Sequence, residues 1–441
     1  ERRRLRMAGL QIEYLERLSP ARREIILGRS RGDVSEVLSQ VAPILAALRR
    51  EGDAESLRQH RQFKADLILG DLEASPEEIA AAYRAVDPEV LAALKAAAAN
   101  VEKFHRAQQE REMWAMEVQP GILAGRLSRP LARVGCYIPG GLASYPSSAL
   151  MTIIPAKVAG VQEIIAATPP GPGMVVNPAT LVAAHLAGAS RLFKIGGPWA
   201  IGSLAYGTEL VPRVDKIVGP GNKYVTAAKL LVFGTVAIDS PAGPSEVLIL
   251  ADETAEPRFL AIDFLSQVEH DPEAAAVLVT PAPELAQKVV EIINSELPHL
   301  PRREIIEAAL ALTKYSAVLV AETLEEAVAF ANLYAAEHLE IVTREPFALL
   351  PRIRHAGSIF LGPYAPVPVG DYASGTNHVL PTGGCARMFS GLSVDDFIKK
   401  PTFQHLSREA LAGLKDTVIT LAESEGLPLH ARAVAERFRY T

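Results

Sequence analysis

The pattern of hydrophobic and polar positions divides the chain into a helical first part and a later part in which strands and helices alternate. In residues 1–130, serine precedes proline at Ser19-Pro20 and at Ser75-Pro76. Both pairs are typical of helix starts, because serine caps free N–H groups and proline fits the first turn. Alanine-rich amphipathic stretches follow at 79–86 and 90–101, as in helices packed on one side. We therefore expect residues 1–130 to be mostly helical.

Short runs of β-branched residues begin near Arg133 and alternate with helical intervals and with turns rich in glycine and proline. The intervals are long enough for right-handed crossovers between parallel strands. The predicted strands are 133–138, 163–167, 191–195, 216–218 and 246–250, followed by a second alternating set over 275–356. Helices are predicted again at 407–425 and 429–438. The pattern indicates an α/β fold with two parallel-sheet modules and a small C-terminal helical domain.

Composition and charge exclude several classes of protein. The 441 residues are too many for a single core, and 49% hydrophobic with 22% charged residues is typical of a globular protein. The net charge of −6 offers no basic face for nucleic acid, and Arg2-Arg3-Arg4 is interpreted as part of a solvated arm. No apolar run reaches the ~18 residues of a membrane helix. Two cysteines without Cys-x-x-Cys spacing indicate neither a disulfide framework nor a thiolate zinc site, which suits a cytoplasmic enzyme.

Glycine-bearing turns follow three predicted strands, at Gly140-Gly141, Gly196-Gly197 and Gly219-Pro220-Gly221. Each turn opens a predicted helix, whose free N–H groups attract phosphates, so a nucleotide cofactor is physically reasonable. The alternative is that these glycines only close tight turns, since neither Gly-x-Gly-x-x-Gly nor a Walker motif occurs.

Gln267 and His270 are candidate metal ligands at the end of a helix predicted to start near Pro257. Their spacing of three places both side chains on one helix face, and an amide oxygen with an imidazole suits zinc or a similar divalent metal. The alternative is a histidine that interacts with the helix dipole. Asp371, in a glycine- and proline-rich loop, and His430, between the last helices, are candidates for two further ligands. A turn or cap and a surface histidine are their alternatives.

Glu337-His338 is a candidate acid–base pair where a predicted helix gives way to the apolar run 339–342. Histidine can take a hydroxyl proton near neutral pH, and a carboxylate can activate water. The pair therefore suits an oxidation followed by a hydration. A solvated helix end is the alternative.

Several long segments together resemble the histidinol dehydrogenase family, over nearly the whole chain. They include Tyr-Ile-Pro-Gly-Gly at 137–141, Tyr-Pro-Ser-Ser at 145–148, the segment 214–222, Ala-Gly-Pro-Ser-Glu at 242–246, Leu-Ser-Gln at 265–267, Glu-His-Asp at 269–271, Glu-His-Leu at 337–339 and Gly-Leu-Ser-Val at 391–394.

The resemblance implies oxidation of L-histidinol through histidinaldehyde to L-histidine, with two NAD⁺ reduced in succession. His338 would take the alcohol proton, and Glu337 would help water to add to the aldehyde. The implied zinc ligands are Gln267, His270, Asp371 and His430. The implied substrate contacts are these four ligands, His338, Ser245, His378 and Glu425.

The resemblance also implies two incomplete Rossmann-like domains and a homodimer whose C-terminal helices cross over, so that Glu425 and His430 complete the partner's site. The expected divisions are an N-terminal helical arm at 1–29, a first Rossmann-like domain at 30–136 with 246–392, a second, NAD-binding domain at 137–245, and a C-terminal helical dimerisation domain at 393–441.

Cofactor binding departs from the family pattern at one position. Tyr137 and Asn222 match cofactor positions, but Trp199 stands where the family usually has glutamine. Stacking on an indole would replace an amide hydrogen bond there.

Two other hypotheses follow: a zinc- and NAD-dependent relative that oxidises another small polar alcohol, such as a dihydroxypropane sulfonate, and a metal-dependent hydrolase or non-catalytic metal-binding protein.

Overall fold

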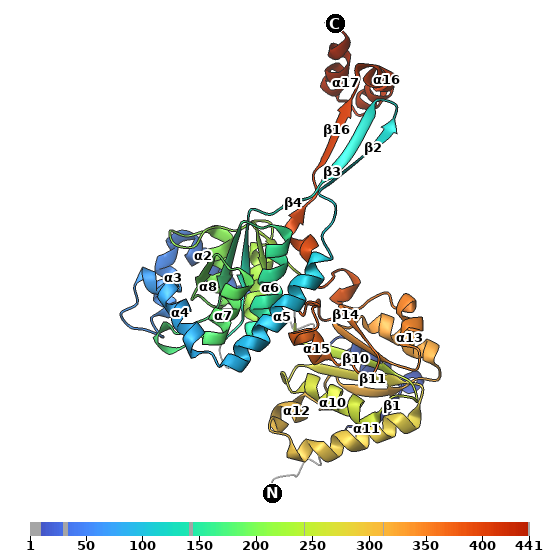
Figure 1. The fold of residues 1–441 in the computed structure, drawn as a ribbon. Coiled ribbons are helices and arrows are strands. Elements are labelled where there is room, and N and C mark those ends of the chain that lie inside the picture. Colours follow the sequence, from blue (N-terminus) through green and yellow to red (C-terminus); the bar gives the residue numbers. More distant parts are fainter. Residues whose placement is uncertain (1–9, 30–33, 141–143, 242, 312, 440–441) are drawn as a thin grey trace. The chain divides into compact units, whose positions relative to one another are not determined.

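The computed structural model describes residues 10–29, 34–140, 144–241, 243–311 and 313–439 (Figure 1). They form two units: the larger runs up to residue 108 and from 131 to 397, and the smaller contains 109–130 and the residues from 398 onwards. The basic run Arg2-Arg3-Arg4 and Gly141 lie outside the described residues. Within the described ranges, no helix is both long and apolar enough to cross a membrane.

The first sheet of the larger unit contains five parallel strands in the order β7-β6-β5-β8-β9. The strands are β5 (Arg133–Tyr137), β6 (Glu163–Ala167), β7 (Arg191–Phe193), β8 (Lys216–Val218) and β9 (Ala237–Ile238). The helices between them are α6 (Pro146–Ala159), α7 (Pro178–Ala187), α8 (Gly197–Tyr206) and α9 (Lys223–Val232). Four predicted strands are thus confirmed. The strand order reverses between β5 and β8, which is a topological switch point.

Helices from the first part of the chain cover this first sheet. They are α2 (Ser35–Glu51), α3 (Asp53–His60), α4 (Pro76–Ala85) and α5 (Pro88–Arg106). Helix α2 contacts α8 and α9, whereas α4 contacts α7 and α5 contacts α6. Leu45 and Leu48 of α2 share a hydrophobic core with Phe193. The packing therefore differs from the expected grouping of 30–136 with 246–392, because the apolar faces of these helices are buried against the first sheet.

The second sheet contains six parallel strands in the order β1-β12-β11-β10-β13-β14. The strands after β1 are β10 (Glu246–Ala251), β11 (Ala275–Thr280), β12 (Ala317–Val320), β13 (His338–Val342) and β14 (Ser358–Leu361). The helices of this half are α10 (Pro257–Val268), α11 (Pro283–Glu296), α12 (Arg303–Ala309), α13 (Leu324–Tyr334), α14 (Pro346–Leu349) and α15 (Val367–Tyr372). Ile249 shares a core with α10–α12 and Leu250 shares one with α13, so β10 is buried on both faces, as expected of a central parallel strand.

The N-terminal segment contributes a strand as well as a helix. β1 (Ile12–Tyr14) pairs in parallel with β12 at the sheet edge, and α1 (Pro20–Leu27) follows it. A run of three residues is too short for its pattern to predict a strand, and its backbone groups find partners only once the sheet has formed. The expected helical arm over 1–29 therefore includes an edge strand of the second sheet.

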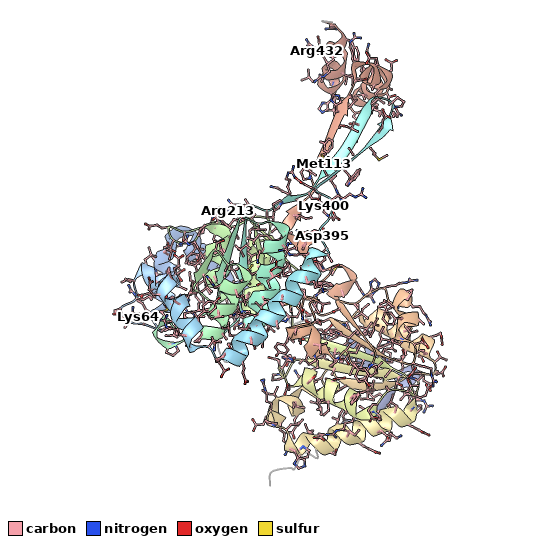
Figure 2. All side chains as sticks on the ribbon, in the orientation of Figure 1. Lys64, Met113, Arg213, Asp395, Lys400 and Arg432 are labelled. Atoms are coloured by element: carbon pink, nitrogen blue, oxygen red, sulfur yellow. The ribbon has the colours of Figure 1, made fainter. Side chains whose placement is uncertain are left out.

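The smaller unit combines antiparallel strands with two helices. β2 (Met113–Gln119) and β3 (Ile122–Leu127) form a hairpin that β16 (Thr402–Leu406) extends, while β4 (Arg129–Pro130) pairs with β15 (Ile398–Lys399). The predicted C-terminal helices are confirmed as α16 (Arg408–Ser424) and α17 (Pro428–Ala435); Figure 2 labels Met113 on β2 and Arg432 on α17. The hairpin corrects the helical prediction for 1–130. Its sequence signal is the Pro120-Gly121 turn, where Gly121 has φ +79°.

Ser75 forms a capping box with Glu78 at the helix start predicted for α4. Its hydroxyl accepts a hydrogen bond from the N–H of Glu78 at 3.2 Å, and Glu78 Oε2 accepts one from the N–H of Ser75 at 2.8 Å. These two bonds satisfy donors that the helix itself leaves without partners.

Ser75→Ala is expected to lower the free energy of unfolding by about 1 kcal/mol, because an N–H in the first turn of α4 loses its acceptor. Urea denaturation followed by circular dichroism measures this change. The matched control is Ser295→Ala, since that exposed hydroxyl donates only to the Ile292 carbonyl in its own helix. Equal stability of wild type and Ser75→Ala would contradict the capping role.

Candidate active site

A cavity of about 690 Å³ lies between the two sheets of the larger unit. The first sheet contributes the loops that follow β5 and β8, and dinucleotides bind at such a switch point on the carboxyl edge of a sheet. The second sheet contributes residues at the starts of β10 and β13, which is its amino edge. The predicted site residues that line the cavity are Tyr137, Asn222, Ser245, His270, Glu337, His338, Asp371 and His378.

Four predicted site residues do not line this cavity. Gln267 is buried within α10. Trp199 lies in the first turn of α8, where its indole N–H donates to Glu55 Oε1 at 3.2 Å. Glu425 and His430 are exposed residues of the smaller unit, at the end of α16 and the start of α17.

Glu337 is a buried carboxyl group immediately before β13. Its Oε2 accepts hydrogen bonds from the Ser245 hydroxyl at 2.7 Å and from the N–H of Glu246 at 2.8 Å. Burial raises the pKa of Glu337 to about 7, although the nearby His338 opposes this effect. A carboxyl group with such a pKa can accept and return a proton near neutral pH. The solvated helix end considered for this position is therefore excluded.

His338 is held at one ring nitrogen and open at the other. Its Nδ1 lies 3.0 Å from the carbonyl oxygen of Glu246. Because a carbonyl can only accept, Nδ1 carries the hydrogen, and Nε2 is the acceptor of the neutral ring. Nε2 has no hydrogen-bond partner among the described residues and stands 3.6 Å from Asp371 Oδ1. Burial opposes a positive charge, but Glu337 and Asp371 raise the pKa of His338 to about 9.

Asp371 lies on the short helix α15 rather than in the loop that its sequence suggests. Burial favours a higher pKa, but His338, His378 and His270 hold the pKa of Asp371 below its usual value. His378 Nδ1 donates to the carbonyl oxygen of Asp371 at 2.8 Å, so its Nε2 accepts from the Ser148 hydroxyl at 3.2 Å. Three imidazoles thus act electrostatically on one carboxylate.

The residues expected to bind zinc have side chains of the chemical types that bind metals. Gln267, His270 and Asp371 offer an amide, an imidazole and a carboxylate, all of which zinc accepts. The Gln267 amide nitrogen is buried without a hydrogen-bond partner in the described part of the chain, so the protein does not fully engage this amide group, whose oxygen is the atom that would bind a metal. No three His, Cys, Asp or Glu side chains among the described residues are grouped to hold a metal. A zinc site here would therefore depend on Gln267 and on a ligand from elsewhere.

The local structure around these ligands differs from the expected helix face. Helix α10 ends at Val268, and His270 is exposed two residues beyond that end. Pro272 explains the stop, because a proline disfavours helical backbone at the residue before it. His270 therefore reaches the cavity from a turn.

Tyr137, at the end of β5, contacts the turns that follow β7 and β8 on the opposite side of the cavity. The Tyr137 hydroxyl accepts from the N–H of Gly197 at 3.1 Å. Asn222 caps α9, since its Oδ1 accepts from the N–H groups of Tyr224 and Val225. Gly219 has φ +122°, and a Cβ built there would lie 2.1 Å from the carbonyl oxygen of Tyr137. Only glycine fits this close approach without a shift in the backbone.

Comparison with known proteins gives the family of the chain. The model of the histidinol dehydrogenase family matches residues 27–438. The chain belongs to the histidinol dehydrogenase family. A histidinol dehydrogenase of Methanothermobacter thermautotrophicus is 50% identical over 414 residues, which cover 94% of this chain and 96% of that protein. One from Heliobacterium mobile is 52% identical over 406 residues, covering 92% and 94%. The crystal structure of histidinol dehydrogenase from Elizabethkingia anophelis has a TM-score of 0.91 at 38% identity and covers 98% of each chain.

Three polar residues around this histidinol dehydrogenase family site were not predicted from the sequence. Ser148 and Glu246 fall inside the segments 145–148 and 242–246 that carry the resemblance, so a signal for both was present. Arg29 has no comparable signal, because its partner Glu246 is 217 positions away along the chain.

Gly219→Ala is expected to lower the free energy of unfolding by about 1–3 kcal/mol through backbone strain alone, and by more because of the close approach to Tyr137. Calorimetry measures the change. The control is Gly234→Ala, since Gly234 has a similar φ of +95° but no atom within 4 Å of an added Cβ. If both variants lost the same free energy of unfolding, the close approach of Gly219 to Tyr137 would contribute nothing to the loss.

Proposed function

We propose that this protein oxidises histidinol to histidine in two steps, each of which reduces one NAD⁺. Membership of the histidinol dehydrogenase family and the names of its relatives support this substrate. The observation that carries the chemistry is the pair Glu337 and His338 on one cavity wall. The pKa of Glu337 is about 7, and Nε2 of His338 has no hydrogen-bond partner among the described residues.

His338 is the group that we assign to the alcohol step. As hydride leaves the alcohol carbon, the hydroxyl proton must pass to a base. Nε2 of His338 suits this role, because the bond from Nδ1 to the Glu246 carbonyl keeps the ring in the tautomer whose free acceptor is Nε2. The pKa of His338 is about 9, so its ring is protonated on both nitrogens at neutral pH as long as no cation neutralises the nearby carboxylates. It acts as a base once Asp371 has its own counter-charge.

Glu337 is the group that we assign to the aldehyde step. An aldehyde is oxidised through its hydrate, so water must first lose a proton as it adds to the carbonyl carbon. With a pKa of about 7, the Glu337 carboxylate is a stronger base than an exposed one. The Ser245 hydroxyl holds Oε2 at 2.7 Å and so fixes the orientation of the carboxyl plane.

Zinc would be held by Gln267, His270, Asp371 and His430. When bound, it supplies a positive charge next to Asp371 and a fixed point that orients the polar groups of the substrate. The further substrate contacts would come from Ser245, His338, His378 and Glu425.

NAD⁺ would lie against the loops after β5 and β8, beside Tyr137 and Asn222. The switch point of the strand order and the place of both residues in the cavity lining support this location. The stacking expected of Trp199 stays a prediction. Its indole N–H is engaged by Glu55, so stacking would use the ring face with that bond retained.

A homodimer is the assembly that we propose, with Glu425 and His430 completing the site of the partner. Its support is the exposed apolar surface of the smaller unit, where Met113, Met116, Val118, Leu421 and Leu429 are all strongly exposed. Monomers rarely leave such groups uncovered. The cytoplasmic location expected from the sequence also stays a prediction.

Two variants separate the steps. Glu337→Gln is expected to lower aldehyde oxidation by roughly 10²–10⁴-fold, the usual value of a general base, while retaining alcohol oxidation. His338→Asn should impair alcohol oxidation to a similar degree. NADH formed per histidinol in a single turnover distinguishes them, because wild type forms two and Glu337→Gln forms one.

The matched controls are Glu291→Gln on the surface of α11 and His299→Asn, which should both form two NADH. Chelation should abolish turnover, and added zinc should restore it. No NADH from histidinol with zinc loaded and NAD⁺ saturating would refute the proposal. A panel of other small polar alcohols, including a dihydroxypropane sulfonate, would then identify the true substrate class.

Subunit complementation tests the dimer. Co-expression of His430→Asn with Glu337→Gln should restore about a quarter of wild-type activity, because half of randomly formed dimers are mixed and each mixed dimer has one intact site. Each variant alone should stay inactive in the full reaction. Absence of restored activity in dimers isolated with both tags would contradict a shared site.

A further inference from the structure

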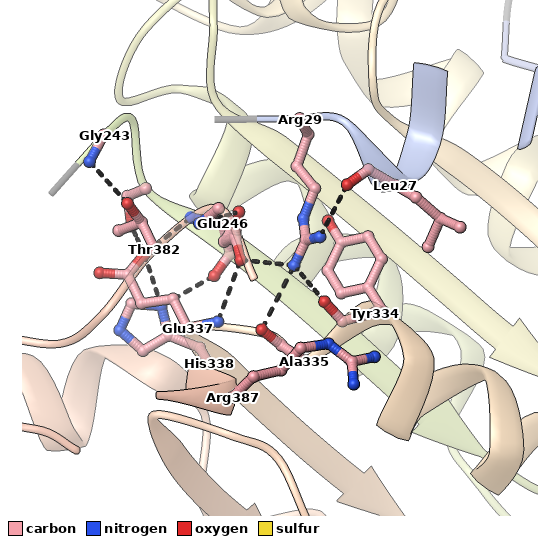
Figure 3. A network of polar contacts seen from close by, with 12 residues as sticks. Leu27, Arg29, Gly243, Glu246, Tyr334, Ala335, Glu337, His338, Thr382 and Arg387 are labelled. Carbon is pink, nitrogen blue, oxygen red and sulfur yellow. Dashed lines mark hydrogen bonds and ion pairs between the residues drawn. The ribbon is translucent and has the colours of Figure 1, made fainter. Parts of the chain in front are cut away.

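Glu246 is a fully buried carboxylate behind the cavity wall, at the first position of β10 (Figure 3). Its Oε1 accepts from the N–H of Glu337 at 3.2 Å, and its Oε2 accepts from the N–H of Gly383 at 3.2 Å. Its backbone N–H donates to Glu337 Oε2, and its backbone carbonyl accepts from His338 Nδ1. This one residue therefore holds Glu337 at two points and His338 at one, without lining the cavity itself.

Arg29 is the counter-charge of this carboxylate. Its Nη2 donates to Glu246 Oε1 at 2.7 Å, and the two side chains are 1% and 0% exposed. The guanidinium stacks over the ring of Tyr334, 3.4 Å from the ring centroid. A buried charge without a partner is strongly unfavourable, so each member of this pair compensates the charge of the other.

Arg29 also fixes the turn that carries the acid–base pair. Its Nη2 donates to the carbonyl oxygens of Tyr334 at 2.7 Å and Ala335 at 3.4 Å. Ala335 has φ +53°, a left-handed conformation that residues with a Cβ rarely adopt. Such strain persists only where surrounding contacts hold it. Glu337 follows two residues later.

Packing alone does not account for an ion pair at this position. The rest of β10 is apolar and buried, and a well-packed hydrophobic side chain in place of a buried ion pair is often as stable or more stable. The carboxylate instead joins three segments that are distant in sequence: Arg29 after α1, Glu337 before β13, and Gly383 beside the cavity residue Thr382.

We propose that Glu246 and Arg29 are positioning residues, which set the orientation of Glu337 and the tautomer of His338 for the reaction. This inference rests on the proposed function, and it assigns a role to residues that touch neither substrate nor cofactor. The charged and titratable groups around Glu337 are His338, Glu246 and Tyr334, with Arg29 behind Glu246.

Glu246→Gln tests the proposal. The amide keeps the size of the side chain but presents an NH₂ group to the Gly383 N–H or to Arg29, so at least one bond is lost. We expect kcat for both steps to fall by about tenfold or more while KM for histidinol changes by less than about threefold. We also expect the acid limb of the aldehyde step to move to lower pH. Burial is the main cause of the raised pKa of Glu337, and the charge of Glu246 adds to it.

Arg29 variants supply the rescue experiment. Arg29→Met should resemble Glu246→Gln, whereas Arg29→Lys should recover part of kcat because it keeps the counter-charge. If Glu246→Gln does not fold, Arg29→Lys against wild type carries the comparison of kcat with KM, because lysine keeps the charge but cannot reproduce the guanidinium bonds to the Tyr334 and Ala335 carbonyls. The matched control is Leu319→Ala, a fully buried position on β12 that shares a hydrophobic core with Tyr334. It should lose stability with kcat per folded molecule and pH profile unchanged.

Two outcomes separate this inference from the function on which it rests. If wild type forms no NADH from histidinol, the proposed function fails. If wild type is active, and Glu246→Gln loses activity only in proportion to its unfolded fraction with the pH profile of wild type, the positioning role is refuted and the function stands.

Discussion

The parallel pairing of β10 with β13 is the constraint on which the candidate site depends. Val247 lies opposite His338 in this pairing, so the residues just before these two positions also meet. Ser245 and Glu246 thereby reach Glu337, although the two segments are about ninety positions apart. A shift of one residue in this register would turn the side chain of His338 to the other face of the sheet and remove the pair.

Burial gives these groups their chemistry. A carboxyl group and an imidazole at a solvated helix end would titrate near their ordinary values. In the cavity wall between the two sheets, desolvation raises the pKa of Glu337, and the nearby carboxylates raise the pKa of His338. The same desolvation makes charge balance obligatory, which explains why the carboxylate of Glu246 is accompanied by a guanidinium behind the wall of the cavity.

The two sheets contribute opposite edges to the cavity. The first sheet offers its carboxyl edge at the switch point, where loops with glycine and helix N-termini can accept a dinucleotide. The second sheet contributes its amino edge, whereas ligands of open α/β sheets generally bind at the carboxyl ends of the strands. This arrangement places the acid–base residues opposite the loops after β5 and β8. In the function that we propose, a substrate between them would meet the nicotinamide on one side and a base on the other.

The sequence by itself determined most strands of both sheets, the capped helices, the family, and most of the residues that line the cavity. Those features are local: a β-branched run, a Ser-Pro start or a motif is complete within a few positions. Only the tertiary structure decided the rest. The edge strand β1 is too short to have a pattern, and the helices before residue 107 have apolar faces that do not specify which sheet they cover. Arg29 meets Glu246 across a separation of 217 positions. Such pairings depend on packing and desolvation over the whole unit, which no short stretch of sequence encodes.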